Sequence, residues 1–231
     1  MSSRPLVGAP GRYELRQPLK RDLFSRVERG VLLADDGSAT SVILRDWRDA
    51  PLWTRPLSIL LAQREACSIG ALPPIDGVPA LVARGRGWLM RSHVDGLPLH
   101  EAPPRDARWY AQARRLLQTV HKAGVTHNDL AKEPNWIVRD DGGPGIVDFQ
   151  LARVARARRG SSRLLAREDL RHLLKHKRKY ARALLTPTEL RLLATPSAPA
   201  RWMRRWIKPV YNTLTRRILG WQDREGQGPR P

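Results

Sequence analysis

The feature that most constrains this chain is the stretch HNDLAKEPNWIVRDDGGPGIVDFQ, residues 127–150. Its two short apolar runs, NWIV and GIV, are typical of strands, and the turn residues between them predict a hairpin. Asn135 starts the first run, Asp129 lies six residues before it, and Asp148 follows the second run. Carboxylate and amide oxygens are the ligands that Mg²⁺ prefers. The stretch therefore predicts a site that faces a metal-bound phosphate.

The order of the predicted elements indicates an α+β fold. Alternating apolar residues predict strands within residues 25–34, 38–47 and 79–94, the last range holding two strands around Gly85 and Gly87. Apolar residues at helical spacing predict helices over 55–71, 104–123, 164–185, 187–194 and 199–220. The helix over 104–123 should bury Tyr110, Ala113, Leu116, Leu117 and Val120. Strands and one helix precede a run of helices, which predicts two lobes with a cleft between them.

Composition indicates a folded cytoplasmic protein. The chain has 231 residues, of which 41% are hydrophobic, enough for one core or two small lobes. It has no run of about 18 apolar residues, so no membrane-spanning helix is expected. Its first residues lack the pattern of a secretory signal. The single cysteine, Cys67, excludes an internal disulfide and is expected to be a small buried residue near a helix.

Positive charge is concentrated in the C-terminal third. The formal net charge is +20, and residues 153–231 hold 21 Lys and Arg against 5 Asp and Glu. This asymmetry predicts an anionic partner. Residues 199–220 combine tryptophans with arginines at helical spacing, which suits an anionic membrane surface; a helix with a buried apolar stripe is the alternative. A nucleic-acid partner is not expected, because no recognition motif accompanies the charge.

Two segments of the chain resemble the protein-kinase-like superfamily. HNDLAKEPN is similar to the catalytic loop H-R-D-x-x-x-x-N, and VDFQ is similar to the metal-binding D-F-G segment. The segments look less like eukaryotic-type protein kinases and more like compact bacterial or atypical members, such as RIO-like kinases and lipopolysaccharide-core (Kdo or heptose) kinases. The resemblance implies a bilobal fold with a β-rich N-lobe over 1–95 and a reduced helical C-lobe over 96–222. Residues 223–231 would then form a flexible tail.

The resemblance also implies roles for the residues of the two loops. Asp129 would be the catalytic base that takes the acceptor proton, and Lys132 would reach the transferred phosphate. Asn135 and Asp148 would bind Mg²⁺, and ATP would be the phosphate donor. His127 is expected to be a buried support for the loop rather than an acid or base.

Upstream of these loops, the resemblance implies a nucleotide-binding set. Arg45 stands where the strand lysine of the family is expected, and Glu65 follows twenty residues later as its partner. Lys20 and Arg26 belong to KRDLFSRV, the best alignment to a phosphate-binding glycine loop, where basic side chains would substitute for the backbone amides of the three missing glycines. Residues 91–95 would form the hinge against which adenine lies.

Several departures from the family pattern limit the comparison. Asn135 lies six residues after Asp129 rather than five. Asn128 replaces the arginine of the catalytic loop, and Gln150 replaces the glycine of D-F-G. No A-P-E segment follows. Together with Arg45, these departures keep a catalytically weak pseudokinase scaffold among the alternatives.

The function expected from the sequence is an ATP- and Mg²⁺-dependent kinase that phosphorylates a Ser or Thr hydroxyl of a protein. A kinase of a membrane-associated sugar, such as a lipopolysaccharide-core residue, is the alternative that keeps the same chemistry. The basic C-terminal segments favour this alternative, because they would hold the protein at the inner face of a membrane. The expected location is therefore cytoplasmic, with possible peripheral contact to the membrane.

Overall fold

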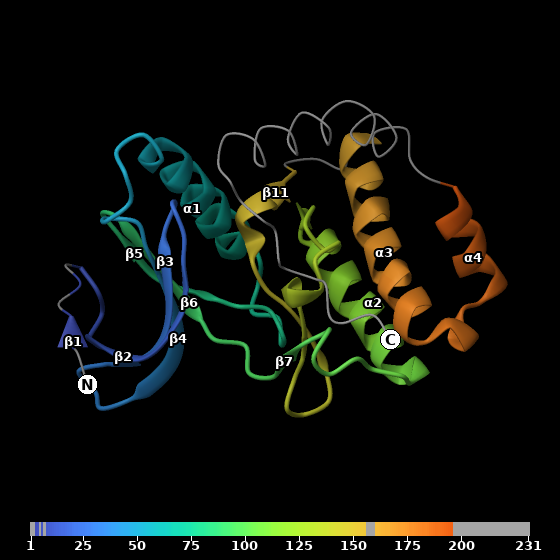
Figure 1. Ribbon diagram of the computed structural model, residues 1–231, viewed down its shortest axis with the longest axis horizontal. Helices are drawn as coiled ribbons and strands as arrows, with labels where there is room; N and C mark the ends of the chain where they lie inside the picture. The colour runs from blue at the N-terminus through green and yellow to red at the C-terminus, as the bar shows by residue number, and fades with distance from the viewer. Residues whose placement is uncertain (1–2, 5, 7, 156–159, 196–231) are drawn as a thin grey trace.

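The computed structural model describes residues 3–4, 6, 8–155 and 160–195. These residues form a mixed α+β fold, with a sheet-rich N-terminal part followed by several helices (Figure 1). The helix expected over 199–220 and the tail expected over 223–231 lie outside the described residues. The helix and the tail therefore stay predictions from sequence.

A six-stranded antiparallel sheet forms the N-terminal part. Its spatial order is β1 (Ser3–Arg4), β2 (Arg12–Arg21), β3 (Arg26–Leu33), β4 (Ala39–Asp46), β6 (Trp88–Ser92) and β5 (Leu81–Gly85). The strands expected within 25–34, 38–47 and 79–94 are confirmed. The long strand β2 was not expected, because Tyr13 is its only buried residue and the apolar alternation of a strand is missing.

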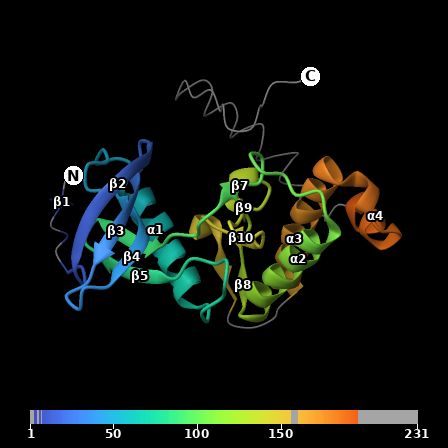
Figure 2. The same ribbon diagram turned by 90° about the horizontal axis from the view of Figure 1, so that it is seen from below.

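Helix α1 (Arg55–Gly70) packs against one face of this sheet. Side chains alternate along β4, so Val42 and Leu44 enter the core on the far face, while Arg45 points to the α1 side. Figure 2 shows α1 between the sheet and the rest of the molecule. Cys67, which was expected to be buried, is exposed on the outer side of α1. The sheet and α1 thus turn Arg45 toward the helical part of the chain.

Three helices form most of the C-terminal part. They are α2 (Ala107–Lys122), α3 (Gly160–Tyr180) and α4 (Pro187–Ala194). The predicted inner face of α2 is confirmed, because all five expected residues are buried there in the main core. Asp106 accepts a hydrogen bond from the backbone N–H of Trp109 and caps the helix start. None of the described helices is long and apolar enough to span a membrane.

Short strands connect these helices and carry the polar loops. One small sheet has the order β10 (Pro144–Ile146), β9 (Trp136–Val138) and β7 (Leu97–Pro98), and another pairs β11 (Arg153–Val154) with β8 (Val125–Thr126). The 3-10 turns are η1 (Glu133–Asn135), η2 (Phe149–Leu151) and η3 (Arg182–Leu184). The hairpin predicted from NWIV and GIV is therefore confirmed as β9–β10.

Candidate functional site

The loop after β8 brings three of the predicted residues together. The side-chain Nδ2 of Asn135 donates to the backbone carbonyl of Asp129 at 2.9 Å and to its Oδ2 at 3.1 Å. The Lys132 Nζ lies 3.1 Å from the same Oδ2. The backbone N–H of Val147 donates to the Asn135 carbonyl at 3.0 Å, which joins this loop to the one after β10. Asp129, Lys132 and Asn135 therefore form one hydrogen-bonded group.

Asp148 adds a second carboxylate in a strained backbone position. Its φ and ψ are both 68°, in the left-handed region that a residue with a side chain rarely adopts. Such conformations cost about 1–3 kcal/mol and persist where the surroundings impose them, often at functional sites. Its Oδ1 is buried without a hydrogen-bond partner and lies 3.7 Å from Arg45 Nη2. This oxygen is therefore available to a cation.

A buried carboxylate, Glu65, holds two arginines above Asp148. Glu65 is fully buried on α1, with Oε2 lying 3.2 Å from Arg45 Nε and Oε1 lying 3.0 Å from Arg91 Nε. The predicted contact between Arg45 and Glu65 is confirmed. Arg45 Nη1 also donates to the Ser25 hydroxyl at 3.4 Å. Because one carboxylate neutralises only one of two guanidinium groups, a positive charge remains beside Asp148.

Arg91 had no assigned role in the sequence, where it appeared only as the first residue of the expected hinge. The signal was a basic residue in the apolar strand WLMRS. Both arginines lie on the side of the sheet that α1 covers, as the β4–β6 pairing requires: Ile43 stands opposite Arg91, and Arg45 stands opposite Leu89. Residues from two strands thus converge on one helix carboxylate.

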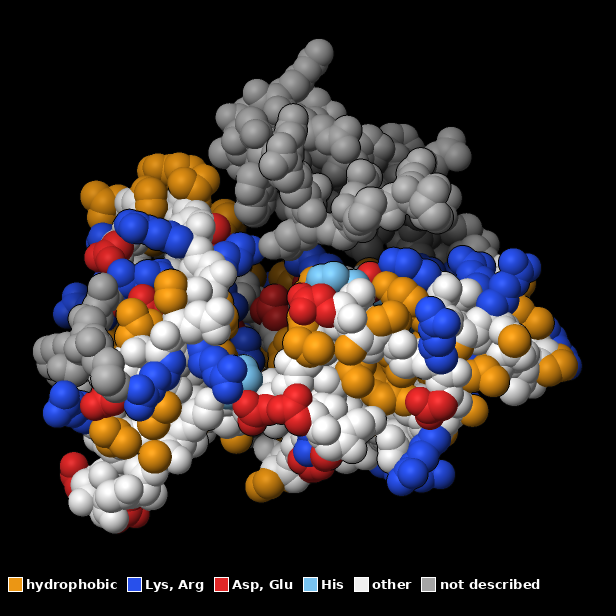
Figure 3. All heavy atoms as spheres, turned by 60° about the horizontal axis from the view of Figure 1, so that its bottom comes forward, with side chains coloured by type: hydrophobic (Ala, Val, Ile, Leu, Met, Phe, Trp, Pro, Cys, Tyr) orange, Lys and Arg blue, Asp and Glu red, His pale blue; other side chains and the backbone are white. Residues whose placement is uncertain are grey.

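The two loop carboxyls have opposite electrostatic settings. Burial opposes the charged form of Asp148, but Arg45 and Arg91 outweigh it and hold the pKa of its carboxyl below the usual range. Burial raises the pKa of Asp129, although the ammonium of Lys132 acts in the opposite direction. Figure 3 shows acidic and basic side chains along the boundary between the sheet-rich part and the helical part. Asp148 is thus kept ionised, while Asp129 is better suited to accept a proton.

Asp169 of α3 fixes the loop from below. Its Oδ2 accepts from the backbone N–H of His127 at 2.8 Å, and its Oδ1 accepts from the N–H of Asn128 at 2.9 Å. The ring of His121 lies 3.0 Å from Oδ2 as a third partner. Asn128 also has a left-handed φ of 65°. Asp169 was missed in the sequence, although its helical spacing to buried Leu173 placed an acid on an apolar face.

His127 supports the loop as predicted, because both ring nitrogens are used inside the protein. Its Nε2 donates to the Val147 carbonyl at 2.9 Å, and its Nδ1 accepts from the Asp129 N–H at 3.3 Å. The ring centroid lies 4.7 Å from that of Phe149. Burial lowers the pKa of His127. A neutral, fully enclosed imidazole therefore bridges the two loops.

The turn between β2 and β3 is stabilised by its own side-chain acceptor. Asp22 Oδ1 accepts from the backbone N–H of Phe24 at 2.9 Å and of Ser25 at 2.8 Å. Ser58 of α1 donates through its hydroxyl to the Phe24 carbonyl at 2.7 Å. Two amides that a phosphate could bind are therefore occupied by a carboxylate. The sequence showed the missing glycines but not this internal acceptor.

Lys20 and Arg26 are not brought into this group. Lys20 is exposed, with its Nζ 3.6 Å from Asp22 Oδ2. Arg26 Nε lies 2.8 Å from Glu28 Oε1, and its Nη2 lies 3.6 Å from Asp46. Asp46 faces the side of the sheet opposite to Arg45, because neighbouring strand residues alternate. Arg26 thus belongs to a separate ion-pair cluster on the other face.

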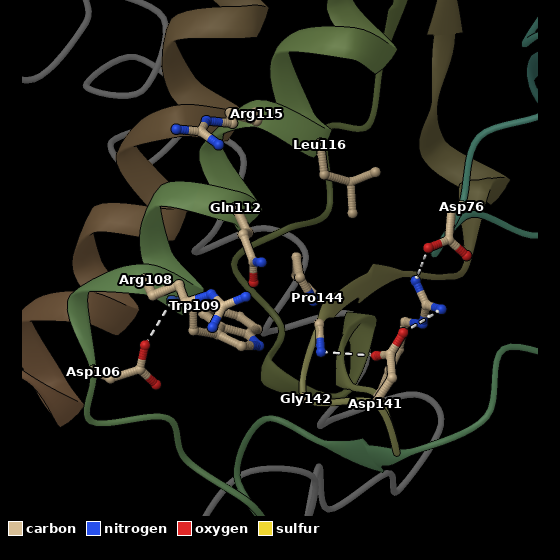
Figure 4. Close-up of a pocket in the computed structure, with 12 residues that line it drawn as sticks. Asp76, Asp106, Arg108, Trp109, Gln112, Arg115, Leu116, Asp141, Gly142 and Pro144 are labelled. Atoms are coloured by element: carbon tan, nitrogen blue, oxygen red, sulfur yellow. Dashed lines mark hydrogen bonds and ion pairs between the residues drawn. The ribbon is translucent and has the colours of Figure 1, made fainter.

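A cavity of about 560 Å³ lies elsewhere, between the start of α2 and the β9–β10 turn (Figure 4). Its charged lining residues are Asp76, Asp106, Arg108, Arg115, Arg139 and Asp141. Arg139 is paired with both Asp76 and Asp141. None of the predicted site residues lines this cavity. The convergence of polar groups, rather than this cavity, therefore defines the candidate site.

The donor set at the two loops fits Mg²⁺ bound together with phosphate. Asp148 offers a buried carboxylate oxygen. Asn135 donates to Asp129 through its Nδ2, so its side-chain oxygen is the atom that would bind the metal. Among the described residues, no group of three or more His, Cys, Asp or Glu could hold a metal by itself. Mg²⁺ commonly takes only one or two protein carboxylates and completes its shell with water and substrate phosphates.

We expect Asp169→Ala to lower the free energy of unfolding by about 3 kcal/mol, because two backbone N–H groups and the His121 ring lose a buried charged acceptor. Urea unfolding would measure the loss, and hydrogen exchange should be faster at the amides of His127 and Asn128. Asp141→Ala removes an exposed carboxylate and should cost less than about 1 kcal/mol. Equal losses in the two variants would contradict the role of Asp169.

Stability should fall as the solution becomes mildly acidic. Burial lowers the pKa of four of the six histidines: His93, His127, His176 and His172, the last to about 4. The unfolded chain takes up these protons below about pH 6.5, before the folded protein does. The free energy of unfolding should therefore drop by about 1–2 kcal/mol between pH 7.5 and pH 5.5. The drop should be smaller in His172→Gln. A free energy of unfolding at pH 5.5 that equals or exceeds the value at pH 7.5 would contradict the prediction.

Comparison with known proteins assigns the chain to no family. No family model and no curated protein matches the sequence. The chemistry of the site therefore has to be inferred from the contacts of its own residues.

Proposed function

We propose that the protein is an ATP- and Mg²⁺-dependent phosphotransferase with a bilobal, protein-kinase-like fold. The sheet with α1 would be the N-lobe, ending near residue 95, and the later elements would be the C-lobe. The observation that carries the proposal is the convergence of two carboxylates, the Asn135 amide and several cations from separate elements. Lys132 and Asn135 contact Asp129, while Arg45 connects Asp148 to Glu65.

In the proposed reaction, the acceptor hydroxyl attacks the γ-phosphorus while the bond to the bridging oxygen of ADP breaks. Asp129 takes the hydroxyl proton, for which its raised pKa suits it. Lys132 would face the negative oxygens of the transferred group. When bound through Asn135 and Asp148, Mg²⁺ would neutralise phosphate charge. Arg45 and Arg91 would add positive charge where the phosphates of ATP enter.

Arg45 would act as the phosphate-binding cation in place of a lysine. Glu65 fixes its Nε, which leaves the rest of the guanidinium directed toward Ser25 and Asp148. A planar guanidinium can contact two phosphate oxygens, whereas an ammonium acts as a point charge. Adenine would lie against residues 91–95, where His93 pairs with Asp95 at 2.8 Å.

The acceptor that we propose first is a Ser or Thr hydroxyl of a protein, and the alternative is a hydroxyl of a membrane-associated sugar. Both are alcohols, so Asp129 would serve either as the base. Transfer of labelled phosphate from ATP into protein or into glycolipid would distinguish them.

A nucleotide-binding scaffold without transfer activity is the second candidate function. The turn between β2 and β3 favours loss of transfer, because Asp22 occupies the amides of Phe24 and Ser25 that would otherwise hold the phosphates of ATP in place for reaction. A phosphate would have to compete with this carboxylate or bind through the arginines alone. In that case Asp22→Asn should bind nucleotide more tightly, since the competing charge is removed.

The phosphotransferase proposal predicts a rise in melting temperature with Mg²⁺-ATP. Asp148→Ala should abolish the rise, because a metal ligand is lost. Asp129→Asn should keep the rise but reduce phosphate transfer by about 10²-fold or more, since the base is lost. Asp141→Ala, an exposed carboxylate outside the site, should behave as the unmodified protein.

Two results would contradict this proposal. Absence of a thermal shift at millimolar nucleotide would exclude both proposed functions, the phosphotransferase and the nucleotide-binding scaffold. If the thermal shift is the same in Asp129→Asn and no acceptor receives phosphate, only the nucleotide-binding scaffold would remain as an explanation.

A further inference from the structure

Large apolar side chains are exposed at the start of α1. Leu52 and Trp53 are 77% and 68% exposed, more than any other large hydrophobic residue of the described part. Leu57 and Leu60 continue the surface on the first turns of α1, each more than 40% exposed. Figure 3 shows hydrophobic side chains gathered along the upper edge of the sheet-rich part, next to basic ones. Clustered exposure of this kind marks an interaction surface.

Hydrogen bonds fix the backbone on both sides of Leu52 and Trp53. The Thr54 hydroxyl is buried and lies 2.8 Å from the Leu23 carbonyl and 2.9 Å from the Pro51 carbonyl. Arg55 Nε donates to the Ala50 carbonyl at 2.9 Å. The backbone before and after Leu52 and Trp53 is therefore fixed, and their exposure is a property of the fold.

The exposed apolar segment itself carries positive charge, and the exposed Asp49 just before it lies 3.9 Å from Arg26. Residues 50–64 contain Arg55 and Arg64 but no Asp or Glu. Glu65, the next residue, is fully buried and bound to Arg45 and Arg91. Within the described ranges, no carboxylate forms an ion pair with Arg55, whose guanidinium donates to backbone carbonyls instead. The surface therefore combines apolar side chains with cations that are not neutralised locally.

We propose that this surface docks on an anionic membrane. The docking face consists of Leu52, Trp53, Leu57, Leu60, Arg55 and Arg64. The leucines and the tryptophan would enter the interfacial region of the bilayer, while Arg64, and Arg55 through the N–H groups that do not bind Ala50 and Arg48, contact anionic headgroups. The inference does not depend on the proposed phosphotransfer.

Charge argues against the other occupants. In a symmetric dimer through this face, Arg55 and Arg64 of each copy would meet the same cations of the other copy. Residues 199–220 of the same chain are also rich in arginine, so they would be repelled by the face rather than attracted. An anionic lipid surface complements both the apolar and the positive character of the face.

Flotation of the full chain with lipid vesicles tests this docking face directly. The protein should bind vesicles of phosphatidylcholine with phosphatidylglycerol more tightly than vesicles of phosphatidylcholine alone, and raised salt should weaken binding. Leu52→Ser combined with Trp53→Ser should weaken binding about tenfold or more. Leu97→Ser combined with Leu190→Ser removes two other exposed leucines, about half exposed and outside this face, and should leave binding unchanged.

The single cysteine gives a local readout that needs no engineered site. Cys67 is exposed and follows Leu60 and Arg64 at helical spacing, so it lies on the same stripe of α1 as these two residues. A fluorophore on Cys67 that is sensitive to polarity should shift to the blue on anionic vesicles. The same label on Leu190→Cys, in a Cys67→Ser background, should not shift.

Three outcomes would overturn the docking face. One is absence of binding by the unmodified chain, or equal binding to neutral vesicles. Another is unchanged binding by the Leu52 and Trp53 double variant, which would assign binding to the rest of the chain. The third is a dimer in the absence of lipid that this double variant dissociates, which would assign the face to a second copy.

Discussion

The site depends on the buried carboxylate of Glu65. A carboxylate removed from water costs several kcal/mol unless cations pair with it, and Glu65 is fully buried between Arg45 and Arg91. This requirement fixes α1 against β4 and β6, because one helix residue must meet side chains from two strands. It also fixes Arg45, which reaches Asp148 and so connects the sheet to the loop after β10. A cation and an anion from distant segments are thereby held at one place.

In the helical part, Asp169 is the buried carboxylate that positions the loop after β8. Its carboxylate accepts the backbone N–H groups of His127 and Asn128, and His127 in turn bridges to the Val147 carbonyl. One buried acid therefore positions the arginines, and another positions the loop that carries Asp129. Each of these acids acts through a neighbouring group, which is why neither needs to touch a substrate. The docking face is at the start of α1, and Glu65 lies in the second half of the same helix.

The sequence was sufficient where a regular pattern determines the structure. Apolar spacing predicted α2, with Leu117 inside, and the runs around DDGGP predicted the β9–β10 hairpin. The pairing of Arg45 with Glu65 was also predicted, because the resemblance to the kinase-like superfamily implied a strand cation paired with a helix carboxylate. Strand β2 was missed because a mostly exposed strand has no apolar alternation. Asp169 was missed because only the tertiary fold shows which polar groups a buried acid satisfies.

The central claim is that Arg45, held by Glu65 beside Asp148, is the cation that binds the phosphates of ATP. Titration calorimetry with Mg²⁺-ATP can compare Arg45→Met with Arg26→Met, an arginine of the same sheet on its opposite face. Loss of a charge-assisted contact should weaken binding about tenfold or more in Arg45→Met, while Arg26→Met should bind like the unmodified protein. Far-ultraviolet circular dichroism would establish that both variants are folded. Equal affinity of a folded Arg45→Met and the unmodified protein would contradict the claim.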